Sequence, residues 1–141
     1  MGEADVARIE SALGCLLPGE YRDFLRRHSD EVCRIKAAVP FRAVLWTDAD
    51  AVIRENLDAR KRSDAMTIGK DGEPWPEEFL VVGTNGGGDY WFVDRSGAKW
   101  GVWFWQHEAQ EVEEHYDSFE LYMAELRQVV RNPARWQLPP G

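Results

Sequence analysis

A run of carboxylates in the C-terminal third of the chain has the residue types that could do chemistry. Between positions 107 and 121 no Lys or Arg interrupts the acids Glu108, Glu111, Glu113, Glu114, Asp117 and Glu120. A pair of them could serve as general acid and general base, but this requires burial that separates their pKa values. Nothing in the sequence predicts such burial. Two other interpretations stay open: a solvated loop, or a contact surface for a basic partner.

Other residues that commonly form catalytic or metal centres lack the necessary spacing. His107 and His115 do not fall on adjacent turns of a helix, and no Cys lies near them to complete a zinc shell. The glycine-rich run 85–89 joins two expected strands, so it predicts a hairpin turn and not a phosphate-binding loop, which would lead into a helix. No Gly-x-Ser-x-Gly motif surrounds a nucleophile. We therefore predict no catalytic residue, no metal and no cofactor.

The charge of the chain is concentrated in one region. Residues 71–120 contain 12 acidic and 2 basic side chains, whereas the rest of the chain is close to neutral. Binding of nucleic acid needs a basic face, so this distribution argues against it and favours a basic protein partner. The alternative is that the charge only keeps the protein from aggregating. Candidate partner-binding residues come from the carboxylate run and from the proline-bracketed loop before it: Glu108, Glu111, Glu113, Glu114, Asp117, Asp71, Glu73 and Trp75.

The sequence shows no targeting or membrane-spanning segment. No apolar run approaches the ~18 residues of a transmembrane helix, and the N-terminal residues 1–5 are acidic and lack a signal-peptide core. Cys15 and Cys33 are expected to be reduced packing residues. We therefore expect a cytoplasmic protein that binds no membrane.

Apolar spacing predicts three helices in the first half of the chain. The first carries Val6, Ile9 and Leu13 on one face and ends at Gly14. The second begins at Pro18 and is expected to end at Ser29-Asp30, with strands following over 32–38 and 41–46. A third helix is expected to be capped by Thr47, with an apolar stripe formed by Ala49, Val52, Ile53 and Leu57.

The second half predicts a sheet followed by a helix. Strands over 79–83, 90–93 and 99–105 are separated by short turns and form an antiparallel meander. Asp117-Ser118 begins a last helix, which ends at Asn132-Pro133. The element order predicts one α+β domain over 1–141, with helices packed on a mostly antiparallel sheet, a core at about 5–131 and an irregular tail over 132–141.

Seven of the chain's 17 aromatic residues lie within residues 90–105. Alternate residues of a strand face opposite sides, so Trp100, Val102 and Phe104 would share one face, and Trp103 and Trp105 the other. Helices on one side of the sheet would cover only one of these faces. Either both faces are covered, or one exposes tryptophans that would suit a protein-binding surface.

Three segments, in this order along the chain, carry a family resemblance. The pattern Leu13-Gly14-x-x-Leu17-Pro18-x-x-Tyr21-x-x-Phe24-Leu25 resembles the opening signature of the SUKH superfamily. The run from Gly86 through Asp94 resembles the central hairpin of that family, and Ser118-Phe119 resembles its closing Ser-Phe motif. Together they span about residues 5–130. One departure is Ser29-Asp30, which stands where many members have Asn-Gly after the second helix.

The resemblance implies a single α+β domain without catalysis or cofactor. Bacterial members of the family are largely immunity proteins that neutralise polymorphic toxins, many of them nucleases, and fungal members regulate cell-wall synthesis. Nuclease toxins tend to be basic, so the acidic charge fits an inhibitor that captures such a domain. The expected function is therefore neutralisation of a toxin by occlusion. A regulatory or scaffolding interaction module, or a small hydrolase with clustered carboxylates, remains the alternative.

Overall fold

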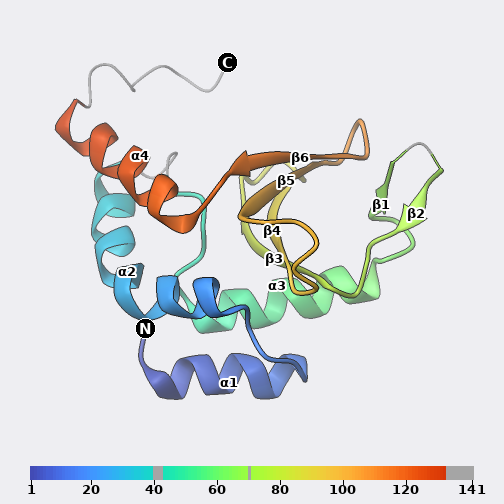
Figure 1. The fold of residues 1–141 in the computed structure, drawn as a ribbon, viewed down its shortest axis with the longest axis horizontal. Coiled ribbons are helices and arrows are strands. Elements are labelled where there is room, and N and C mark those ends of the chain that lie inside the picture. The colour runs from blue at the N-terminus through green and yellow to red at the C-terminus, as the bar shows by residue number, and fades with distance from the viewer. Residues whose placement is uncertain (40–42, 70, 133–141) are drawn as a thin grey trace.

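The computed structural model describes residues 1–39, 43–69 and 71–132. Its elements, in chain order, are α1 (Glu3–Leu13), α2 (Gly19–Ala38), α3 (Ala49–Lys61), β1 (Thr67–Ile68), β2 (Glu73–Pro74), β3 (Phe79–Thr84), β4 (Tyr90–Asp94), β5 (Val102–Gln106), β6 (Glu111–Tyr116) and α4 (Phe119–Arg131). Strands β3 to β6 form one antiparallel meander in chain order, and β1 and β2 form a separate hairpin (Figure 1). The predicted α+β class, with helices and a mostly antiparallel sheet, is confirmed.

The first two helices form the predicted pair. Gly14 ends α1 in the left-handed conformation, with φ of 67°, and its N–H donates to the Glu10 carbonyl. The Glu10 side chain then holds the connection to α2, because its carboxylate accepts from the Leu17 N–H at 2.7 Å and from Arg22 at 2.9 Å. One acidic side chain thereby fixes the angle between the two helices.

The predicted break at Ser29-Asp30 and the strand over 32–38 are wrong, because α2 continues to Ala38. The Ser29 hydroxyl is buried and donates to the Leu25 carbonyl at 2.6 Å, so the helix satisfies it internally. Val32 and Ile35 then face the core one turn apart. The β-branched residues of this segment favoured a strand locally, but their packing against the rest of the protein favours the helix.

The other predicted strand, over 41–46, falls partly on residues 40–42, which lie outside the described residues. Its remaining part makes a single bridge between Leu45 and Gly83 of β3. A side chain at Gly83 would collide with the Val44 carbonyl, so the glycine permits this close approach. This segment therefore covers part of the outer edge of β3.

Helix α3 covers the rest of that edge through one buried side chain. Asn56 of α3 accepts from the Val81 N–H at 2.8 Å and donates to the Val81 carbonyl at 2.9 Å. Its amide thus bonds β3 as a neighbouring strand would. The helix itself begins at Asp48, whose carboxylate accepts from the Asp50 N–H, so the expected cap at Thr47 is displaced by one residue.

Both faces of the sheet are covered, which answers the question that the aromatic pattern left open. Helices pack on one face around Leu80, Trp91 and Val102. The β1–β2 hairpin and the end of α3 enclose the other face, where Trp75 packs edge-on against Phe92 at a ring-centroid distance of 5.2 Å. Trp100 precedes β5 and is the exception, with 75% of its surface exposed.

The predicted last helix is confirmed as α4, which begins after Ser118 and ends before Asn132. Its cap is Ser118, whose hydroxyl accepts from the Leu121 N–H at 3.2 Å. Phe119 stacks on Phe24 of α2 with ring centroids 4.8 Å apart, and the Tyr122 hydroxyl of α4 accepts a hydrogen bond from the Leu45 N–H at 3.3 Å. Helix α4 thereby closes the core over α2, and β6 is the last strand in the order of the four-stranded sheet (Figure 1).

Candidate protein-binding surface

The carboxylate run forms an edge strand and not a loop. Residues 111–116 make up β6, which pairs antiparallel with β5 and lies at the end of the strand order. Glu113 stands opposite Phe104, and Glu114 opposite Trp103. Of the two interpretations, the solvated loop is wrong for residues 111–116, because they pair with the aromatic strand β5, which supplies the apolar contacts that β6 itself lacks. We call Glu108, Glu111, Glu113, Glu114 and Asp117 the acidic edge.

In the part of the chain that the structure describes, the side chains of the acidic edge have no cation partner. Within the described residues, none of the five forms an ion pair with a Lys, Arg or His, although ion pairs occur over the helices. All five are exposed. The negative potential at this edge is therefore left for solvent or for a partner to neutralise.

Repulsion within the acidic edge is visible in one pair of carboxylates. Asp117 shares a hydrogen bond with Glu114 and repels its negative charge, and both effects raise the pKa of Glu114. Both side chains are exposed, so water screens the repulsion. A cation placed between the two groups would remove it.

The structure brings the acidic loop predicted around residues 71–75 next to this edge. The Gly69 N–H at the end of β1 donates to the Gln110 carbonyl before β6 at 2.7 Å. Asp71, Glu73 and Glu111 then line one open hollow of about 380 Å³. Two acidic segments that are far apart in the sequence therefore face a common space.

Lys99 also borders this hollow but does not neutralise it by an ion pair. Its ammonium lies 4.4 Å from the centre of the Trp103 ring, in a cation–π contact. Trp75, predicted as a contact residue, is only 6% exposed and packs against Phe79 and Trp105. Trp75 is therefore a packing residue under the β1–β2 hairpin and does not belong to the candidate protein-binding surface.

A hydrogen-bonded pair that the sequence reading missed fixes the turn beside Glu108. The Asp89 carboxylate accepts from the His107 backbone at 2.9 Å, and its Oδ1 lies 2.7 Å from Nδ1 of the same residue. Burial by itself would raise the pKa of Asp89, but these bonds and one from Asn85 outweigh it and lower the pKa. The two residues lie eighteen positions apart, so only the hairpin register could have identified the pair.

His115 of β6 belongs to the packing of the edge strand. Its Nδ1 accepts from the Trp91 indole N–H at 2.5 Å, and its ring stacks on Tyr116. Partial burial lowers the pKa of His115, while Glu125 and Glu113 oppose the shift. The neutral His115 ring thus packs β6 against the sheet.

Trp100 lies at the far end of the acidic edge. The following residue, Gly101, has a φ of 77°, and a side chain there would collide with the backbone of Tyr116 and Asp117. The Trp100 carbonyl accepts from the Trp103 indole at 2.8 Å, which holds this turn in place. The exposed Trp100 therefore directly precedes the residue whose backbone approaches Asp117, and an exposed tryptophan is typical of a protein contact.

The buried carboxylate of the described residues has a structural use. Asp94, 8% exposed, accepts from the Ser96 N–H and hydroxyl and from the Lys99 N–H. These bonds close the β4–β5 turn. The acidic edge itself is exposed, which favours binding over the acid–base chemistry that requires a desolvated carboxylate.

Comparison with protein families agrees with this architecture. The model of the SMI1 / KNR4 family (SUKH-1) matches residues 2–125, which is most of the chain. The chain belongs to the SUKH-1 family. Domains of the SUKH type include immunity proteins and regulator-like proteins and are generally non-catalytic. Comparison with curated proteins and with solved structures gives no significant match. Among the described residues, no helix of this SUKH-1 domain has the length and apolar character to cross a membrane.

Proposed function

We propose that this SUKH-1 domain is an immunity protein that binds a basic toxin domain, of the nuclease type, and neutralises it by occlusion. In this proposal the domain is not an enzyme, needs no cofactor and acts in the cytoplasm. Family membership supports the class of function, because the family includes immunity proteins. The acidic edge, which has no cation partner within the described residues, is the observation that carries the proposal.

Electrostatics explains why such an edge would serve an inhibitor. Nuclease domains carry basic surfaces that bind phosphates, and a complementary acidic surface both steers their approach and covers the same groups. The repulsion between Glu114 and Asp117 is relieved when a Lys or Arg of the partner lies between them. Asp71 and Glu73 extend the same negative surface across the hollow.

A simpler use of these acids is to protect an open sheet edge. Charged side chains on an edge strand oppose pairing with another chain and so prevent aggregation. That role requires charge on β6 alone, whereas the hairpin adds Asp71 and Glu73 from a separate sheet to the same hollow. This convergence favours a surface that serves binding.

The proposal is tested by co-expressing this protein with basic toxin domains of the nuclease type. Co-expression should restore the growth of cells that produce the toxin. The variant with Glu111, Glu113 and Glu114 all changed to Lys should reduce the association rate by about tenfold or more at low salt, because steering depends on these charges. Circular dichroism and thermal unfolding establish that the variant is folded.

A matched triple variant separates local charge from net charge. Asp23 and Asp30 on α2 and Asp64 after α3 are exposed, and changing them to Lys alters the net charge by the same amount. This control should retain most of the association rate. If the two triple variants associate equally fast, the acidic edge is not the contact surface, and the proposal fails.

The exposed Trp100 favours a second candidate, a regulatory interaction module that binds its partner through an aromatic anchor. In that case Trp100→Ala should abolish binding and the charge variants should change it little. For an immunity protein of the proposed kind, the charge variants should slow association strongly and Trp100→Ala should slow it little.

A further inference from the structure

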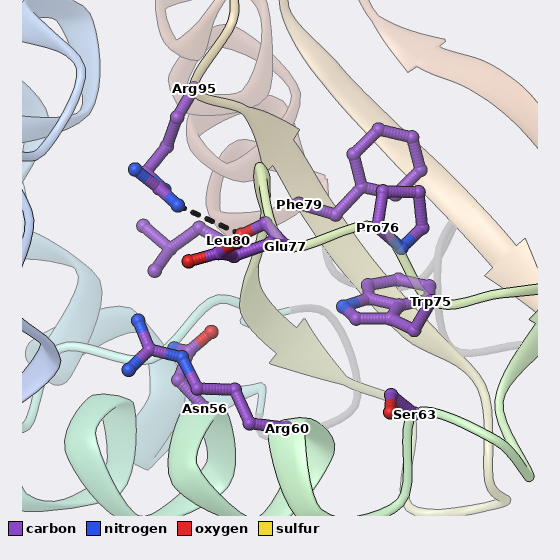
Figure 2. A pocket seen from close by; sticks show the side chains of 9 residues that line it. All are labelled: Asn56, Arg60, Ser63, Trp75, Pro76, Glu77, Phe79, Leu80 and Arg95. Atoms are coloured by element: carbon purple, nitrogen blue, oxygen red, sulfur yellow. Dashed lines mark hydrogen bonds between the residues drawn. The ribbon is translucent and has the colours of Figure 1, made fainter.

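A second cavity lies away from the acidic edge, between the end of α3 and the start of β3. Its volume is about 280 Å³, and Arg60 and Asn56 of α3 form one wall. Trp75, Pro76 and Glu77 form the side, and Arg95 comes from beyond β4 (Figure 2). Figure 2 shows the guanidinium groups of Arg60 and Arg95 on opposite sides of this space.

Neither arginine is neutralised by a carboxylate of the described residues. Arg95 donates to the Glu77 carbonyl oxygen at 2.8 Å, and over residues 1–39, 43–69 and 71–132 no ion pair involves it or Arg60. The neighbouring Arg62, by contrast, pairs with Asp58 at 2.9 Å. The guanidinium groups of Arg60 and Arg95 therefore give this cavity a positive charge, in a protein whose net charge is −8.

The walls of the cavity are held in place by hydrogen bonds. The Asn56 amide donates to the carbonyls of Val52 and Val81, so both of its donor bonds are already made. The backbone N–H of Trp75 donates to the Ser63 carbonyl at 3.0 Å, and the backbone N–H of Arg95 donates to the Glu78 carbonyl at 2.8 Å. Among the described lining residues, the donors left for a ligand are the remaining guanidinium N–H groups, the Trp75 indole N–H and the Ser63 hydroxyl.

We propose that this cavity binds a small organic anion. Its carboxylate or phosphate group lies between Arg60 and Arg95, and its apolar part lies against Trp75 and Pro76. Guanidinium groups recognise both oxyanions through paired, charge-assisted hydrogen bonds. The volume lies near the lower end of small-molecule sites, which begin at about 300 Å³. The Glu77 side chain also lines the cavity, and its negative charge disfavours anions of high charge and favours a monoanion.

Titration of the isotope-labelled full chain tests this directly by nuclear magnetic resonance. Benzoate, inorganic phosphate and the neutral benzamide are added separately while the Trp75 indole and the Arg60 and Arg95 Nε–H signals are followed. Benzoate should give saturable shifts of these signals, and benzamide should give none. Saturation by phosphate as well assigns the site to oxyanions in general, whereas saturation by benzoate alone assigns it to carboxylates with an apolar group.

Two substitutions on the same helix provide the matched comparison. Arg60→Gln should weaken benzoate binding by about tenfold, which corresponds to about 1.4 kcal/mol. Arg54→Gln removes the same charge from an exposed position that pairs with Glu55, and it should leave binding nearly unchanged. Glu77→Gln should strengthen binding.

Three results would overturn the anion site. These are the absence of saturable shifts with both anions, equal shifts with benzamide, and equal weakening by the two arginine substitutions. None of them affects the proposed immunity function, because the cavity contains no residue of the acidic edge.

Discussion

Replacement of Asn56 by Ala should destabilise the protein strongly, because this side chain bonds both α3 and the edge of β3. Asn56 is 4% exposed, and its amide makes three hydrogen bonds: to the Val52 carbonyl, to the Val81 carbonyl and from the Val81 N–H. Val81 is fully buried. Truncation removes the partner of both polar groups of the Val81 backbone.

The magnitude follows from these bonds. Each hydrogen bond contributes about 1 kcal/mol, and a buried polar group without a partner costs about 1–3 kcal/mol. We expect a loss of about 3–5 kcal/mol in the free energy of unfolding. This is a large fraction of the ~5–15 kcal/mol that stabilises a typical domain.

Urea unfolding measures this loss through the transition midpoint, with the slope of the transition as the check on two-state behaviour. Hydrogen exchange at the Val81 amide should accelerate in parallel. Arg54→Ala on the exposed face of α3 is the control and should change stability by less than about 0.5 kcal/mol. A loss below about 1 kcal/mol for Asn56→Ala would refute the reasoning that this amide completes the sheet edge.

Three further substitutions test other parts of the structure. Ser118→Ala removes the cap of α4 and should cost about 1 kcal/mol, measured as a lower unfolding midpoint in urea. Gly101→Ala places a side chain against the backbone of Tyr116 and Asp117 at a φ of 77°, and it should lower the melting temperature and shift the Trp100 fluorescence. His115→Gln should reduce the loss of stability on acidification. Because burial lowers the pKa of folded His115, the unfolded chain takes up the proton first as the pH falls through about 6.5, so this residue's contribution is present above that pH and lost below it. Unfolding midpoints of wild type and variant are measured at about pH 7.5 and about pH 5.5. The midpoint should fall less between these pH values in the variant than in the wild type, and an equal fall in both would contradict the prediction.

The sequence was sufficient for the elements whose local signals agree with their packing. The stripe of α4, the cap region at Ser118 and the α1–α2 connection at Gly14 all follow from helical spacing and capping chemistry. The second half of α2 was misread because β-branched Val32 and Ile35 favour a strand locally. Only their contacts with the core select the helix.

The candidate surface was partly predictable for a related reason. Its acids could be identified from composition alone, but β6 has too few apolar residues to indicate a strand, so the edge itself was missed. The approach of Asp71 and Glu73 to Glu111 depends on the Gly69–Gln110 hydrogen bond between distant segments. No local pattern encodes such a contact.

The most direct test of the proposed function is hydrogen exchange of this domain, free and bound to the toxin domain that it neutralises in the co-expression test. We expect protection of the β6 amides and of the β1–β2 hairpin on binding, and weaker binding as salt is added. Protection confined to α1 and α2, with β6 exchanging as in the free protein, would contradict the claim that the acidic edge captures a basic partner.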